Sequence, residues 1–213
     1  MRVSVVSMIG GLALLVSGGP LLAEADLARG ESLYASCAAC HGPDAGGNRV
    51  LGAPRLSHLR EVELVAQLEK FRNGQRGGEG AGASARQMAP MAAALPDAQA
   101  LWDVSAYIAS RQSPLPTATV SGDARLGGDY YNQFCGACHG ATAAGNVALN
   151  SPTLAGSDDW YLVDQLRAFR DGTRGALRGD RTGRQMRSMA AVLPSEQALA
   201  DVVAFIHSRA RQQ

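Results

Sequence analysis

Lysine, histidine and cysteine are scarce in this sequence. Its 213 residues include one lysine, four histidines and four cysteines, and only 5% of them are aromatic. The 20 basic residues are balanced by 19 acidic ones, so the formal net charge is +1. This balance excludes a strongly basic surface of the kind that binds nucleic acid or anionic membranes. Convincing alternation of apolar and polar residues is also missing, which argues against β-strands.

One long apolar run is present, at the N-terminus. A single arginine precedes an apolar segment over residues 3–22, and the small residues of "AEA" follow it. This order is typical of a secretory signal peptide. We predict a signal peptide over residues 1–25, cleaved after Ala25 or, alternatively, after Ala23, and a mature chain in the periplasm. An uncleaved membrane anchor is the alternative, because the run approaches the roughly 20 residues that span a bilayer.

The chain repeats itself with a constant spacing of 98 residues. The stretch "CAACH" from Cys37 returns as "CGACH" from Cys135. Further pairs at the same spacing are Pro54/Pro152, Leu56/Leu154, Leu68/Leu166, Phe71/Phe169, Gly74/Gly172, Arg86/Arg184, Met88/Met186, Met91/Met189, Leu95/Leu193, Pro96/Pro194 and Ile108/Ile206. So many matches at one spacing indicate two copies of one unit. Two copies are too few for a solenoid, so we predict tandem domains.

A linker separates the two copies. The stretch "RQSPLPTATVSGD" at Arg111–Asp123 is rich in proline and small polar residues, as extended linkers are. We therefore place an N-terminal domain at residues 26–112, a linker at 113–123 and a C-terminal domain at 124–213. Each domain then has roughly 90 residues, a size at which a small core gains from a large apolar cofactor in its centre.

Both copies have the same order of predicted elements, all of them helical. A helix leads into each cysteine motif, at Leu27–Ser36 and Leu126–Phe134. Two further helices follow in each copy, with apolar residues at helical spacing. In the first copy these residues are Leu64, Leu68 and Phe71, and then Leu101, Val104 and Ile108. We expect the methionines between these helices to lie in a loop rich in glycine and arginine. The predicted fold class is all-α.

The cysteine motifs carry the chemistry. C-x-x-C-H is the signature of covalent haem c attachment, in which two thiols add to the vinyl groups of one porphyrin and the adjacent histidine reaches the iron. A disulfide would account for neither histidine, and zinc would need a further ligand. We therefore predict two haem c groups. Their attachment sites are Cys37 and Cys40 with His41 as iron ligand, and Cys135 and Cys138 with His139 as iron ligand.

The sixth position of each iron decides between electron transfer and chemistry at the metal, because a second strong ligand closes the iron to substrates. His58 and His207 are not repeated, whereas each copy has two methionines, in "RQMAPM" and "RQMRSM". Methionine pairs with histidine in cytochromes c, although filling a core is its commonest use. We favour ligation by methionine. The spacing leaves open Met88 or Met91 in the first copy and Met186 or Met189 in the second.

Taken together, two C-x-x-C-H units, a short linker and an M-x-x-M segment before each final helix resemble the di-haem cytochrome c4 family of class I c-type cytochromes. The resemblance covers essentially the whole mature chain. In that family the ligand is the methionine seven residues before the leucine that precedes the last helix. The resemblance therefore implies that Met88 and Met186 are the axial ligands, with Met91 and Met189 packed nearby.

The sequence departs from the family pattern at Pro96 and Pro194, where a serine is usual. This departure changes how the last helix of each copy starts. Asp97 and Ser195 are the substitutes for the missing cap. The assignment of the ligands is unaffected.

The resemblance also implies a function: an electron carrier, not an enzyme. Proteins of this family are periplasmic, soluble or membrane-associated, and pass electrons from the respiratory chain towards terminal oxidases. The expected partners are redox proteins, such as a membrane-bound electron donor, a terminal oxidase or a dehydrogenase, with no small-molecule substrate and no nucleic acid. Two alternatives stay open. One is a haem enzyme, such as a peroxidase or a sulfur-compound-oxidising cytochrome, and the other is the di-haem subunit of a dehydrogenase complex.

Arginine is the candidate partner for the haem propionates, because its fork donates two hydrogen bonds to a carboxylate. Arg86 and Arg184 are repeated, and they are our candidates for that role. Arg178, Arg181 and Arg187 are not repeated, and they either meet an acidic partner or form a solvated loop. Because the second domain has more arginine near its methionines, we expect the second haem to have the higher potential.

Overall fold

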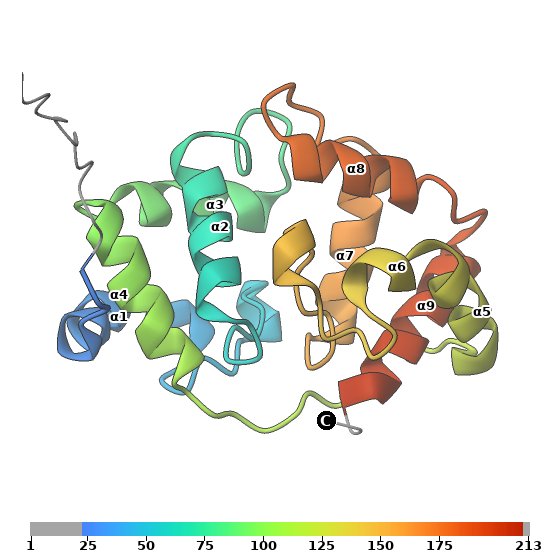
Figure 1. Cartoon of the computed structure of the whole chain (residues 1–213), viewed down its shortest axis with the longest axis horizontal. Coiled ribbons are helices and arrows are strands. Elements are labelled where there is room, and N and C mark those ends of the chain that lie inside the picture. Colours follow the sequence, from blue (N-terminus) through green and yellow to red (C-terminus); the bar gives the residue numbers. More distant parts are fainter. Residues whose placement is uncertain (1–22, 211–213) are drawn as a thin grey trace, which may run out of the picture.

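The computed structural model describes residues 23–210, which form two helical domains side by side (Figure 1). Most of the predicted signal peptide, residues 1–22, lies outside the described residues. The first domain contains α1 (Leu27–His41), α2 (Glu61–Arg72), α3 (Ala83–Ala93) and α4 (Ala98–Ala109). The second contains α5 (Ala124–Phe134), α6 (Gly136–His139), α7 (Asp159–Arg170), α8 (Arg181–Ala190) and α9 (Glu196–Arg209). The segment between α4 and α5 runs along one edge of both domains (Figure 1).

The predicted all-α fold class is confirmed. Besides the named helices, each domain has a short 3-10 helix, at Arg49–Leu51 and at Val147–Leu149. The described part of the chain contains no β-strand, only two isolated bridges, Asn48 with Ala53 and Asn146 with Ser151. Within residues 23–210, no helix is long and apolar enough to cross a membrane.

The first and last helices of each domain cross in close contact because a glycine lies at each crossing point. A Cβ atom at Gly30 of α1 would lie 2.1 Å from the carbonyl oxygen of Asp103 in α4. At the equivalent crossing of α5 and α9, a Cβ atom at Gly127 would lie 1.8 Å from the carbonyl oxygen of Asp201. No side chain fits in such a space, so glycine allows the two backbones to touch. These crossings fix the frame of each domain.

The last helix also holds the beginning of the first helix through a buried carboxylate. In the first domain the Asp103 carboxylate accepts a hydrogen bond from the backbone N–H of Asp26 at 2.9 Å. In the second domain Asp201 accepts one from the backbone N–H of Asp123 at 2.7 Å. Both donors are the N-cap residues of their helices. Each carboxylate is thereby satisfied inside the protein, as buried charges require.

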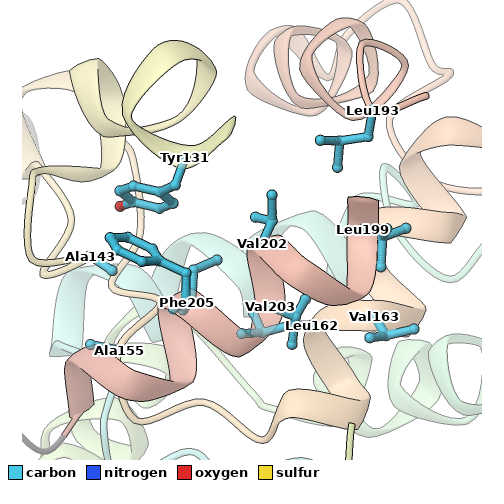
Figure 2. Packing of buried hydrophobic residues seen from close by; sticks show 11 residues of the cluster. Tyr131, Ala143, Ala155, Leu162, Val163, Leu193, Leu199, Val202, Val203 and Phe205 are labelled. Atoms are coloured by element: carbon cyan, nitrogen blue, oxygen red, sulfur yellow. The ribbon is translucent and has the colours of Figure 1, made fainter. Parts of the chain in front are cut away.

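The apolar core of the second domain lies between α5, α7 and α9 (Figure 2). Tyr131 and Phe205 pack with their ring centroids 5.0 Å apart, and the Tyr131 hydroxyl donates to the carbonyl of Gly140 at 2.8 Å. Tyr34 makes the same bond to Gly42 in the first domain, at 2.6 Å. Each tyrosine therefore ties its helix to the residue directly after the haem-motif histidine.

The methionines lie on helices, so our expectation of a methionine-bearing loop was wrong. Met88 is inside α3, and Met186 is inside α8. Both segments consist largely of arginine, glutamine, methionine and alanine, which are good helix formers. The glycine-rich stretch that suggested a loop ends before α3, at Gly82, and α8 begins after Asp180, whose side chain accepts a hydrogen bond from the backbone N–H of Gly183. Each domain therefore has four main helices in place of the three expected.

The last helices begin at the caps that the sequence suggested. The Asp97 carboxylate accepts a hydrogen bond from the backbone N–H of Ala100 at 2.7 Å. The Ser195 hydroxyl accepts one from the backbone N–H of Ala198 at 3.1 Å. The predicted substitution of these residues for the usual serine is confirmed, and it satisfies one of the exposed N–H groups at each helix start.

Candidate haem-binding sites

The two cysteines and the histidine of the first motif lie at the end of α1. Cys40 and His41 follow Cys37 by three and four residues, which places all three side chains on one face of the helix. In the second domain the motif is divided, because α5 ends at Phe134 and His139 lies at the end of α6. Neither cysteine pair forms a disulfide. Cys37 and Cys135 are half-buried, whereas the other two cysteines are exposed.

Burial changes the pKa of the first cysteine of each motif. It raises the pKa of the Cys37 thiol and raises the pKa of the Cys135 thiol to about 11, so both are uncharged thiols near neutral pH. A structural zinc site would need further ligands besides the two thiolates of each motif. Among the described residues, no three histidine, cysteine, aspartate or glutamate side chains are grouped as a metal site.

Both motif histidines are buried and held in one orientation. His41 and His139 are each 4% exposed. The Nδ1 atom of His41 lies 2.8 Å from the carbonyl oxygen of Pro54, and Nδ1 of His139 lies 2.9 Å from the carbonyl oxygen of Pro152. A carbonyl oxygen can only accept, so Nδ1 carries the proton in each ring. The lone pair of Nε2 is therefore the one available to a metal.

The environment also keeps these rings uncharged. Burial lowers the pKa of His41 and of His139, and the hydrogen bond to the proline carbonyl opposes this effect only in part. A neutral imidazole with its Nδ1–H anchored is the form in which histidine binds metals in proteins. The geometry thus prepares Nε2 of both residues as a ligand.

The two methionines of each domain differ in exposure. Met88 and Met186 are partly buried, whereas Met91 is 41% exposed and Met189 is 37% exposed. Helix α3 packs against α2, and α8 packs against α7. Burial therefore favours Met88 and Met186 over their neighbours, the same choice that the family resemblance implied.

The arginines that we expected near the haem propionates are on the surface. Arg86 and Arg184 are both exposed, and an Arg86 guanidinium N–H donates to the carbonyl of Ala81 at 2.6 Å. The arginines Arg178, Arg181 and Arg187 are exposed as well.

Two other arginines, to which the sequence analysis assigned no role of their own, lie at the domain interface. Arg76 and Arg174 each stack on a phenylalanine of their own domain, 4.5 Å from the centroid of Phe71 and 4.4 Å from that of Phe169. Both line a cavity between the domains with Tyr161. They are also separated by 98 residues, so a complete reading of the repeat would have found them.

These two arginines carry like charges, and the only carboxylate among the residues lining the cavity is Asp164. Nε of Arg76 is buried and has no hydrogen-bond partner among the described residues. The Tyr161 hydroxyl accepts a hydrogen bond from Arg76 at 2.6 Å, and the two guanidinium charges lower the pKa of this phenol although burial opposes them. An anionic group such as a haem propionate would complete this set of donors.

The side chains present therefore fit haem c. Each domain supplies two thiols beside a buried histidine with a free Nε2, and a partly buried thioether on a separate helix. Within the part of the chain that the structure describes, the interface supplies one unpartnered donor, Nε of Arg76, that suits a propionate. Haem c itself contributes a reversible change of iron oxidation state.

Comparison with known proteins agrees with this arrangement. A family model described as cytochrome c matches residues 27–112 and 124–210. The fold and the two cysteine motifs thus define a c-type cytochrome with two tandem haem c domains. Cytochrome c4 of Azotobacter vinelandii is 32% identical over 193 residues, which is 86% of this chain and 89% of that protein. The chain belongs to the di-haem cytochrome c4 family.

Two further relatives have a different description. The thiosulfate dehydrogenase electron acceptor of Stutzerimonas stutzeri (strain A1501) is 33% identical over 201 residues, covering 85% of this chain and 87% of that protein. The thiosulfate dehydrogenase electron acceptor of Thiomonas intermedia (strain K12) is 34% identical over 145 residues, 66% of this chain and 65% of its own length.

Among solved structures, the chain is likewise similar to a cytochrome c4 and to a thiosulfate dehydrogenase. The crystal structure of reduced recombinant cytochrome c4 from Pseudomonas stutzeri matches with a TM-score of 0.66 and 28% identity, covering 85% of this chain and 97% of that one. The thiosulfate dehydrogenase TsdBA from Marichromatium purpuratum matches with a TM-score of 0.67 and 28% identity, covering 85% of this chain but only 40% of that one.

Proposed function

We propose that this protein is a periplasmic di-haem electron carrier without catalytic activity of its own. In this proposal Cys37 and Cys40 bind the first haem covalently, and His41 and Met88 are its axial ligands. The second haem has the corresponding residues Cys135, Cys138, His139 and Met186. The two domains occupy residues 26–112 and 124–213, with a linker at 113–123, after removal of a signal peptide over residues 1–25.

The observation that supports a carrier is that both domains offer the same pair of ligands. Each has an anchored histidine with Nε2 available and a partly buried methionine on a separate helix. An enzyme that acts on a small molecule at iron needs one open or weakly held position. Nothing in the two ligand sets distinguishes one domain from the other in this way, so the pair of sites favours electron transfer at both haems.

The partners that we propose are redox proteins. Two relatives are described as electron acceptors of thiosulfate dehydrogenase, and the structure of a thiosulfate dehydrogenase, TsdBA, includes a region similar to this chain. We infer that the electron donor is a dehydrogenase, free or in a complex, and that the electrons pass on towards a terminal oxidase. The protein would act in solution in the periplasm or at the membrane surface.

Exposure of the purified, reduced holoprotein to carbon monoxide tests the proposal. We expect no change in the haem absorption spectrum, because a methionine closes the sixth position of both irons. Prompt binding at one haem would show an open site and would favour a haem enzyme over a carrier. A second measurement tests the partner: reduction of the oxidised protein by thiosulfate and a thiosulfate dehydrogenase, with thiosulfate alone as the control.

A further inference from the structure

A chain of hydrogen bonds links the candidate axial histidine of the first domain to a carboxylate of the second. The carbonyl of Pro54 accepts from Nδ1–H of His41 at 2.8 Å. The N–H of the same peptide group, which belongs to Arg55, donates to Oδ2 of Asp158 at 2.7 Å. One peptide group therefore lies between the imidazole and a half-buried carboxylate from the other domain.

The second domain has the same arrangement in the opposite direction. The carbonyl of Pro152 accepts from Nδ1–H of His139 at 2.9 Å. The N–H of that peptide group, which belongs to Thr153, donates to Oε1 of Glu63 in the first domain at 2.8 Å. The Thr153 hydroxyl donates to the same oxygen at 3.1 Å. Each domain therefore sends one carboxylate to the peptide group behind the other domain's histidine.

The repeat of the chain does not explain this symmetry. At the spacing of 98 residues, Asp158 corresponds to Arg60, and Glu63 corresponds to Tyr161. The two carboxylates lie at different positions of their domains and differ in length, yet each reaches the same peptide N–H. Residues that are not equivalent in the repeat make the same contact in both directions. The contact therefore arises from the way the two domains pack together and was not inherited from the repeated unit.

We propose that Asp158 and Glu63 are positioning residues that lower the reduction potential of the haem in the opposite domain. A negative charge on the N–H side of a peptide group strengthens its carbonyl as an acceptor, because hydrogen bonds in a chain polarise one another. A stronger acceptor at Nδ1–H makes the imidazole a more basic ligand. A more basic ligand favours ferric over ferrous iron, which lowers the potential. The inference rests on the proposed ligation by His41 and His139.

The two carboxylates differ in their other partners. Glu63 is 8% exposed and forms an ion pair with Arg60, with Nη2 2.5 Å and Nε 3.0 Å from Oε1. Asp158 forms no ion pair within the described residues. Glu63 is compensated by this direct ion pair, whereas the charge of Asp158 meets only the longer-range attraction of the Arg55 guanidinium, so Asp158 has the larger effect. The first haem then has the lower potential, the same order that the distribution of arginine suggested.

The test is a pair of charge-removing variants in the holoprotein, with both midpoint potentials measured by spectroelectrochemistry. NMR signals of each haem, assigned through contacts to Met88 or Met186, identify which potential belongs to which domain. In Asp158→Asn the amide oxygen still accepts from Arg55, but the charge is gone. We expect the first haem to become up to tenfold easier to reduce, about 59 mV for one electron, with a clearly smaller change at the second haem. Glu63→Gln should raise the second haem's potential in the same selective way, by less.

Asp171→Asn is the control. It removes the same charge at the other end of α7, where the exposed carboxylate lies 3.5 Å from Nε of Arg170 and does not contact the peptide group behind His41. We expect it to shift both haems by similar, small amounts. A shift in Asp158→Asn that is equal at both haems, or larger at the second, would overturn the proposal. Asp158→Glu keeps the charge and should keep the wild-type potentials, so a shift as large as that of the asparagine variant would also overturn it.

Asp158→Asn is expected to fold, because Asp158 gives no side-chain cap to α7. If Asp158→Asn does not fold, Glu63→Gln alone decides, since it makes the same prediction for the second haem. Failure of this inference is separable from failure of the proposed function. Binding of carbon monoxide by the wild-type protein contradicts the carrier, whereas unselective shifts in a protein that binds no carbon monoxide contradict only the role of the carboxylates.

Discussion

Arg174 of the second domain donates a hydrogen bond to Gln67 of the first, with Nη2 2.9 Å from Oε1. The reverse contact, from Arg76 to Gln165, measures 3.1 Å. Each arginine also bonds the glutamine of its own domain, Arg76 to Gln67 at 2.8 Å and Arg174 to Gln165 at 2.5 Å. The four side chains form a closed ring of hydrogen bonds across the domain interface. Substitution of a residue in this ring therefore tests the interface directly.

Replacement of Arg174 by glutamine should lower the haem potentials and weaken the interface. Burial and the nearby charge of Arg76 lower the pKa of Arg174, so its charge is costly unless an anion such as a propionate compensates it. Loss of this donor should cost about 1–3 kcal/mol in the free energy of unfolding. Spectroelectrochemistry and denaturant titration measure the two effects. Arg178→Gln, which removes an exposed arginine from the same loop, should change little, and equal effects of the two variants would contradict a special role for Arg174.

Replacement of Met88 by alanine should open the sixth position of the first iron. The reduced variant is then expected to bind carbon monoxide at one haem, and the potential of that haem should fall because a thioether favours ferrous iron. Met91→Ala is the matched control, since Met91 is three residues further along α3 and more exposed. It should bind no carbon monoxide. The opposite result would assign Met91 as the ligand, and Met186→Ala with Met189→Ala repeats the comparison in the second domain.

The crossing of α5 and α9 predicts a strong effect for a single methyl group. Gly127→Ala would place Cβ 1.8 Å from the Asp201 carbonyl oxygen, which forces the helices apart. We expect a loss of about 3 kcal/mol in the free energy of unfolding, or failure to fold. Gly82→Ala is the control, because a Cβ atom there meets no atom within 4 Å, and its effect should be small. Thermal unfolding followed by circular dichroism compares the two, and similar stability of both variants would mean that α5 can move away freely.

The local features of this protein could be predicted from the sequence, because they depend on short patterns. The cysteine motifs, the apolar stripes and the caps at Asp97 and Ser195 are each set by a few neighbouring residues. The sequence analysis missed one change in the spacing between the two copies. Tyr34 and Tyr131 make equivalent bonds but are separated by 97 residues rather than 98. The second domain therefore has one additional residue between the tyrosine and the first cysteine, which coincides with the division into α5 and α6.

The domain interface could not be predicted in the same way. The contact of Arg55 with Asp158 joins residues that are 103 positions apart and are not equivalent in the repeat. No periodic pattern indicates which faces of two similar domains will dock. The propionate candidates Arg86 and Arg184 were chosen by repetition alone, whereas the docked structure places Arg76 and Arg174 at the interface. Repetition alone does not separate the exposed arginines from those at the interface, because only the relative position of the domains does so.

The interface also predicts a dependence of stability on pH, through His58. Nε2 of His58 lies 2.7 Å from the hydroxyl of Ser157 in the other domain, and Nδ1 is buried without a partner among the described residues. Burial, together with the charge of Arg55, lowers the pKa of His58 to about 3. The ordinary pKa of histidine is about 6.5, so between these values the unfolded chain binds a proton that the folded protein does not. The contribution of His58 to stability is therefore complete above pH 6.5 and is lost as the pH falls.

Comparison of the wild type with His58→Gln isolates this contribution. One proton changes the free energy of unfolding by at most about 1.4 kcal/mol per pH unit. Between pH 7 and pH 5, a range above the titration of most carboxylates, the wild type should lose about 2 kcal/mol more than the glutamine variant. Denaturant titrations at the two pH values measure this difference. Ser157→Ala keeps the buried imidazole and should keep the wild-type slope. Parallel pH dependence in the wild type and His58→Gln would show that His58 is protonated in the folded protein, and that the interface admits the charge.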